Sequence, residues 1–245
     1  MNIYHYTTFD TFVKIWLSEE LLLCEYKNMN DLYERQKFCE MEILPGKGIS
    51  PKTIAQIGDP MELIFSQISK FRQISFCRDY DDGIKGCKSS MMWGQYAKNE
   101  RGVCIEFDKE KLLLEEEDYF SDVVKYDDKI PCINIESSEF VGDIDEIRKN
   151  IRKIIVDNID TVFFCKHTHW EHENEFRIVS DTKKVIPIKD SITCLYVQKP
   201  DSKETKLLKK LIGDNIPIRY INLESNGKYV DLTIEDLDNS KKLIM

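Results

Sequence analysis

Charged side chains recur at every second position within residues 170–179. Glu173, Glu175 and Arg177 alternate there with polar and apolar neighbours. Successive side chains of a strand point to opposite faces, so this spacing predicts one face with two carboxylates and a guanidinium. Such a face is either an edge that discourages wrong strand pairing or the floor of a polar cleft. In a cleft, Arg177 would bind phosphate or orient the carboxylates.

A second set of residues comes from the ends of separate expected elements and could share a site with Glu175. The imidazole of His5 would bond a ribose hydroxyl, the ring of Tyr96 would stack on a flat base, and Glu175 would stabilise positive charge at an anomeric carbon. Ser75 lies on an expected strand, and Trp93 could form a stacking wall. The alternative is structural: a capping histidine, core aromatics and an ion-paired glutamate.

Histidines gather just before the charged stretch. His167, His169 and His172, with Cys165 or Glu173 nearby, could bind a metal, because a His-x-His pair on a strand puts both rings on one face. The group lacks a second ligand pair at the usual zinc spacing, and histidines at a helix C-terminus also interact favourably with the helix dipole. We therefore expect no metal.

Asn30, Asp31 and Glu34 form a third polar group. They could support the site by contacting a ligand or bracing His5. An Asn or Asp cap with a carboxylate in the first turn is, however, a common helix start.

Composition narrows the class of protein. The chain has 245 residues, of which 42% are hydrophobic and 32% charged, as in ordinary globular proteins. A net charge of −9 gives no broad basic surface, so avid non-specific binding to nucleic acid is not expected, although a narrow single-stranded contact is compatible with it. Neither a secretory signal nor an apolar run long enough to span a bilayer is found, which predicts a cytoplasmic protein without membrane contact.

The periodicity of the chain predicts an α+β fold with a mixed, largely antiparallel sheet and packed helices. Strands and helices follow one another without regular alternation. We expect one domain over residues 1–245, with a helical insertion around 45–73 and a long helix around 143–165. No glycine-rich phosphate loop follows a predicted strand, which counts against a Rossmann or P-loop nucleotide site.

Four blocks of the sequence together resemble an uncharacterised, mostly bacterial family, domain of unknown function 2971. The blocks are Tyr4-His5-Tyr6-Thr7; Asn30-Asp31-Leu32-Tyr33-Glu34; Ser75-Phe76 with Met92-Trp93-Gly94-Gln95-Tyr96-Ala97 and Gly102-Val103-Cys104-Ile105-Glu106-Phe107; and Trp170 to Arg177. They span residues 4 to about 180. This family supplies no activity.

More distantly, the opening Ile3 to Thr8, then an apolar helix and Leu21-Leu22-Leu23, is similar to the start of ADP-ribosyltransferases of the His-Tyr-Glu type. That superfamily includes DNA-modifying bacterial toxins. The resemblance implies an ADP-ribosyltransferase-like fold, in which His5 and Thr7 hold the adenosine ribose of NAD. It also implies that Glu175, in a Glu-x-Glu arrangement with Glu173, acts at the nicotinamide ribose.

The middle aromatic of that pattern is matched incompletely, because Tyr96 lies on a predicted helix and Ser75, on a strand, is not aromatic. Three functions therefore stay open: an NAD-dependent ADP-ribosyltransferase-like enzyme, as a toxin or phage-defence effector acting on nucleic acid or protein; a non-catalytic nucleotide- or partner-binding module; and a metal-dependent hydrolase or nuclease. The first makes NAD the substrate, with catalytic residues Glu175, His5 and Tyr96 and binding residues His5, Thr7, Ser75, Trp93, Tyr96, Glu173 and Arg177.

Overall fold

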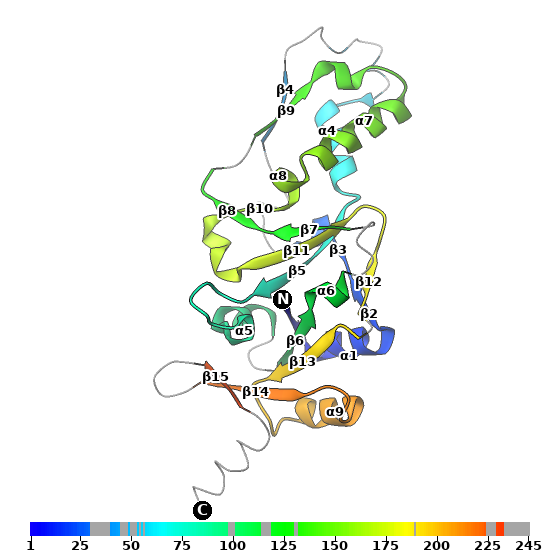
Figure 1. The fold of residues 1–245 in the computed structure, drawn as a ribbon. Coiled ribbons are helices and arrows are strands. Elements are labelled where there is room, and N and C mark those ends of the chain that lie inside the picture. The colour runs from blue at the N-terminus through cyan, green and yellow to red at the C-terminus, as the bar shows by residue number, and fades with distance from the viewer. Residues whose placement is uncertain are drawn as a thin grey trace, which may run out of the picture.

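The computed structural model describes residues 1–29, 40–44, 49, 53, 55, 57–97, 101–113, 119–129, 132–188, 190–223 and 229–232. Within these residues a nine-stranded sheet is packed with helices, and three two-stranded sheets flank it (Figure 1). The predicted α+β class with a largely antiparallel sheet is confirmed.

The chain alternates irregularly between strands and helices. The strands are β1 Asn2–Thr8, β2 Glu20–Leu22, β3 Cys24–Glu25, β4 Glu40–Leu44, β5 Arg72–Arg78, β6 Gly102–Asp108, β7 Phe120–Val123, β8 Lys125–Asp127, β9 Cys132–Glu136, β10 Cys165–His167, β11 Glu175–Ser180, β12 Val185–Pro187, β13 Ile192–Val197, β14 Ile218–Leu223 and β15 Tyr229–Leu232. The α-helices are α1 Phe9–Ser18, α4 Pro60–Ile68, α5 Ser90–Tyr96, α6 Lys109–Leu112, α7 Ile144–Asp157, α8 Ile159–Phe163 and α9 Lys203–Ile212, and the 3₁₀ helices are η1 Tyr26–Asn28, η2 Gly86–Lys88, η4 Ser137–Phe140 and η5 Thr168–Glu173.

The large sheet runs in the order β15-β14-β13-β6-β1-β5-β11-β7, and β3 also pairs with β5. Its neighbours are antiparallel except β13 and β14, which run parallel. Helix α1 begins after Thr8, whose side chain accepts from the backbone N–H of Thr11, and it buries Phe12 and Ile15 against the sheet. A threonine cap followed by an apolar stripe is a common start for a helix that packs on a sheet.

The sheet divides between β1 and β5. Seven residue pairs join β1 to β6, and six join β11 to β5. Pairing between β1 and β5, both fully described, covers Ile3 with Arg78 and Tyr4 with Cys77. Beyond Tyr4 the two strands separate, so the sheet consists of two extended ladders joined over a short segment.

A second hydrophobic cluster lies beyond the β7 edge of the sheet, where α4 packs against α7 and the parallel pair β4–β9 (Figure 1). Where the sequence predicts one long helix around 143–165, the structure has two helices, α7 and α8, which meet at Asn158, and β10 begins at Cys165. The Asn158 side chain donates to Ile154 O (2.9 Å), a local bond that competes with helix continuation.

The helical insertion predicted around 45–73 is represented by α4, which ends at Ile68, and β5 begins at Arg72. Residues 45–48, 50–52, 54 and 56 of this range lie outside the described part of the chain. Among the described residues, no helix is both long and apolar enough to cross a bilayer.

Candidate active site

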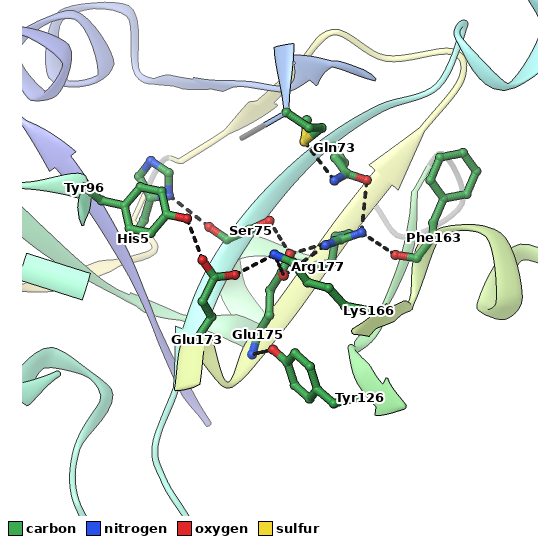
Figure 2. Close-up of polar contacts among 11 residues, drawn as sticks. His5, Gln73, Ser75, Tyr96, Tyr126, Phe163, Lys166, Glu173, Glu175 and Arg177 are labelled. Atoms are coloured by element: carbon green, nitrogen blue, oxygen red, sulfur yellow. Dashed lines mark hydrogen bonds and ion pairs between the residues drawn. The ribbon is translucent and has the colours of Figure 1, made fainter. Parts of the chain in front are cut away.

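A cavity of about 380 Å³ opens where β1 and β5 separate. Its polar lining includes His5, Ser75, Tyr96, Lys166, Glu173 and Glu175, and its apolar lining includes Ile15, Leu21, Met29 and Met92. The polar residues come from β1, β5, α5, β10, η5 and β11, and their side chains converge (Figure 2). Ligand pockets of about 300–1,000 Å³ with few polar groups among apolar ones are typical of small-molecule sites.

Glu175 begins β11 and is the most densely contacted carboxylate of the cavity. Its Oε1 accepts from the Ser75 hydroxyl and from Arg177 Nε (2.6 Å), and its Oε2 accepts from Arg177 Nη2 (2.9 Å). Lys166 Nζ lies 3.5 Å from the same Oε2. The backbone N–H of Glu175 donates to the Tyr126 hydroxyl (3.0 Å), which fixes the start of the strand.

The charge on Glu175 is set by its neighbours. Burial opposes ionisation, but the positive charges of Arg177 and Lys166, with the hydrogen bonds from Arg177 and Ser75, outweigh it and lower the pKa of Glu175 to about 2. Glu175 is therefore an anion at neutral pH, although only 2% of its surface is exposed. It is a weak base and a strong fixed negative charge.

Arg177 lies behind Glu175 and is itself buried. Besides its paired bonds to Glu175, its Nη1 donates to Phe163 O (2.6 Å) and to the Gln73 side chain (3.4 Å). Of the two roles expected for Arg177, its contacts match the orientation of a carboxylate, because the guanidinium is directed at Glu175 and the end of α8 (Figure 2).

Glu173 does not belong to the strand, contrary to the alternation read from the sequence. It ends η5, and Asn174 then takes a left-handed conformation (φ 43°) before β11 begins. Asn174 tolerates this conformation, and Arg78 Nη2 donates to its side-chain oxygen (2.5 Å). Glu173 still reaches the cavity, where it accepts from the Tyr96 hydroxyl (2.5 Å) and Lys166 Nζ (2.7 Å).

Ser75 connects His5 with Glu175. Its hydroxyl donates to Glu175, and its carbonyl oxygen lies 3.1 Å from His5 Nδ1, which therefore donates to it. That bond assigns the free acceptor of the imidazole to Nε2. Burial lowers the pKa of His5, and the bond to Ser75 only partly counters it, so the ring is neutral at pH 7. His5 and Glu175 thus line one cavity, as the sequence predicts.

The predicted stacking residues separate into two environments. Tyr96 ends α5 and lines the cavity. Trp93, predicted as a wall of the pocket, is 2% exposed, and its indole N–H donates to Cys87 O (2.9 Å) while its ring meets Tyr6 edge-on at 5.3 Å. Trp93 therefore packs in the core behind the cavity, because its position on α5 faces the sheet.

Thr7, which was predicted to bind the ligand, does not line the cavity. It is buried on β1 opposite Val103. Asn30, Asp31 and Glu34 lie outside the described residues.

The histidine group does not assemble a metal site. The rings of His167 and His169 lie 4.1 Å apart, and His172 stacks on Trp170 at 6.1 Å. In the part of the chain that the structure describes, no three His, Cys, Asp or Glu residues are placed to hold a metal ion. The metal-dependent hydrolase inferred as an alternative therefore lacks its ligand set there.

Lys166 and Tyr126 are site residues that the sequence reasoning missed. Lys166 is buried on β10, which runs parallel to β8 and places Lys166 opposite Tyr126. A signal existed, because a lysine that follows Phe163-Phe164-Cys165 stands in an apolar run where its charge requires partners. No sequence pattern indicates that the three-residue strands β8 and β10 pair, so the sequence could not have identified Tyr126 as a site residue.

No curated protein matches this chain. Thermus sp. 2.9 DarT in complex with NAD+ is similar with a TM-score of 0.38 and 10% identity, over 93% of this chain and 97% of that one. Thermus sp. 2.9 DarT in complex with ADP-ribosylated ssDNA is similar with a TM-score of 0.37 and 11% identity, over 86% and 87%. Residues 92–178 match the model of a family described as protein of unknown function (DUF2971), and the predicted resemblance to that family is confirmed over this segment.

Proposed function

We propose that the protein is an NAD-dependent ADP-ribosyltransferase-like enzyme, whose cavity between β1 and β5 binds NAD. The observation that supports this most directly is the link through Ser75, which joins neutral His5 and anionic Glu175 in one cavity. A hydrogen-bond acceptor can hold a ribose hydroxyl, and a fixed negative charge can stabilise the positive charge that develops as a nucleoside bond breaks.

The chemistry needs little proton transfer to the leaving group. When the bond between C1′ of the ribose and the nicotinamide nitrogen breaks, its electron pair leaves with nicotinamide, which becomes neutral, and positive charge develops at C1′. Glu175 stabilises this charge without rearranging, because Arg177 and Ser75 already hold its carboxylate in place. Such preorganised charges contribute in the transition state rather than in the ground state.

Glu173 completes the transfer in this proposal. An acceptor hydroxyl or amine forms the new bond to C1′ and gives its proton to Glu173. This carboxylate accepts hydrogen bonds from fewer donors than Glu175 does. Two carboxylates in unlike environments divide the roles of fixed charge and base. Tyr96 presents its ring at the same cavity for stacking on a flat base. The acceptor group belongs to a nucleic acid or a protein, and the enzyme acts on it as a toxin or phage-defence effector.

The test measures NAD binding by calorimetry and nicotinamide release, with and without bacterial lysate. We expect binding and release. NADH is the matched control, because its dihydronicotinamide lacks the positive charge that makes nicotinamide a good leaving group; it should bind without cleavage. Absence of both binding and consumption of NAD would overturn the proposal. Ligand-dependent stabilisation without turnover would favour the alternative, a non-catalytic nucleotide- or partner-binding module.

A further inference from the structure

We propose that Lys166 is a positioning residue, whose ammonium group holds Glu173 and Glu175 side by side as anions. A role of Lys166 in catalysis rests on the proposed function, whereas its electrostatic effect on the two glutamates does not depend on that function. Lys166 Nζ lies 2.7 Å from Glu173 Oε2 and 3.5 Å from Glu175 Oε2. One cation thus bridges two carboxylates that come from different elements, η5 and β11.

The bridge matters because both carboxylates are buried, with 4% and 2% of their surfaces exposed. Two carboxylates at one site repel each other, and without a cation one of them takes up a proton. Arg177 binds Glu175 through two bonds. Among the described residues, the ion pair of Glu173 is the one with Lys166. Removal of Lys166 therefore leaves Glu173 facing an anion without a positive charge in contact.

The ammonium is held where it is needed. Its stem belongs to β10, which is paired with β8, and Nζ lies 4.6 Å from the centre of the Trp170 ring. The aromatic face attracts the cation from one side, while the carboxylates attract it from the other. Because only 6% of the Lys166 side chain is exposed, the geometry leaves it little freedom to move into solvent.

Other titratable groups surround the bridge. They are His5 on β1, Cys77 on β5, Tyr80 after β5, Tyr96 on α5, Tyr126 on β8 and Arg177 on β11. Cys77, Tyr80 and Tyr126 are neutral at pH 7, because burial raises their pKa values. The charges at the bridge are therefore those of the two glutamates, Lys166 and Arg177.

The experiment follows the side-chain carboxyl ¹³C signals of glutamate-labelled protein by NMR as the pH is lowered. In Lys166→Met, a side chain of similar length without charge, the titration midpoint of one cavity carboxyl should rise by about 1–3 pH units. Lys166→Gln, which keeps a hydrogen-bond donor without charge, should show the same rise, and Lys166→Arg should not. Lys209→Met is the control, because Lys209 also lies over an aromatic ring, at 5.5 Å from that of Tyr220, but on α9.

Wild-type midpoints in both neutral variants would overturn the proposal. If these variants do not fold at pH 7, refolding at pH 5, where a carboxyl can take a proton, supports it, and failure at both pH values overturns it. NAD turnover is a separate readout: the acid limb of the pH profile of kcat/KM should move upward in Lys166→Met by the same amount. Wild-type protein without NAD turnover would defeat the proposed function, and the NMR titration would still decide the role of Lys166.

Discussion

Two glutamates are buried in the large sheet, and they are stabilised differently. Glu175 is 2% exposed and Glu106 is 6% exposed. Glu106, on β6, accepts from the hydroxyls of Tyr196 (2.8 Å) and Thr193 (2.6 Å) on neighbouring β13. Glu175 instead binds two cations and a serine, and it faces a cavity.

The difference shows that burial of a carboxylate does not by itself mark a site. The hydroxyls that bind Glu106 come from the adjacent strand and tie two strands together. The groups around Glu175 come from β5, β10 and β11, and they hold a charge at a surface where a ligand can reach it. We expect Glu106 to matter for stability and Glu175 for activity.

The largest expected effect comes from the ion pair. Arg177→Met removes the guanidinium that donates two hydrogen bonds to Glu175. Breaking a buried ion pair lowers the free energy of unfolding by about 3–5 kcal/mol. Tyr196→Phe removes one hydroxyl from Glu106 and should cost about 1.5–3 kcal/mol. Urea unfolding at pH 7 compares them. A larger loss for Tyr196→Phe would show that the two glutamates do not differ as described.

The second largest difference between Glu175 and Glu106 is expected in NAD turnover. Glu175→Gln keeps one acceptor oxygen for Ser75 and Arg177 Nε, but it removes the negative charge and replaces the oxygen that accepts from Arg177 Nη2 with an amide donor, so NAD turnover should fall by about 10²–10³-fold while the protein stays folded. Glu106→Gln should retain wild-type turnover. Nicotinamide release measures both variants. An unchanged rate in Glu175→Gln would remove Glu175 from the catalytic site.

A smaller effect is expected for Tyr96→Phe, which removes the hydroxyl bonded to Glu173. Hydrogen bonds to charged groups contribute about 1.5–3 kcal/mol, so kcat/KM for NAD should fall about tenfold to a hundredfold. Tyr119→Phe is the matched control, because the Tyr119 hydroxyl donates to Val185 O (2.9 Å) and does not line the cavity. Equal losses in both variants would argue against a role for Tyr96 at the site.

The smallest effect concerns pH. The pKa of His5 is lowered in the folded state by burial, so the unfolded chain takes up a proton at higher pH than the folded protein. The contribution of His5 to stability is therefore present above about pH 6.5 and is lost as the pH falls through its folded pKa, with a slope of at most about 1.4 kcal/mol per pH unit. His5→Gln should lose this dependence in urea unfolding curves between pH 7 and 5. Parallel curves for both proteins would contradict it.

Much of this site could be predicted from single residues. The sequence places His5 on a short apolar strand that a capping residue follows, and it places Ser75 and Glu175 on strands as well. Their convergence could be expected, because the resemblance to the ADP-ribosyltransferases implied that His5 and Glu175 act on one NAD molecule. In the sheet, β5 lies beside both β1 and β11.

The rest depended on contacts that periodicity does not encode. Glu173 fits the two-residue period as well as Glu175 does, but one left-handed residue, Asn174, separates the 3₁₀ helix that holds Glu173 from the strand that begins at Glu175. Trp93 and Tyr96 are three residues apart on a helix, so sequence alone could not say which faces the sheet. Lys166 reaches the site through a parallel pair of three-residue strands, too short to leave a pattern.

The separation of β1 from β5 has a consequence for how binding preference can change. The opening is produced by two diverging backbones rather than by small side chains, and each backbone is secured to a different neighbour, β6 or β11. Exchange of lining residues such as Leu21 or Met29 therefore alters which molecule fits without closing the opening. The fold can acquire new ligands at this joint while the ladders on either side keep its stability.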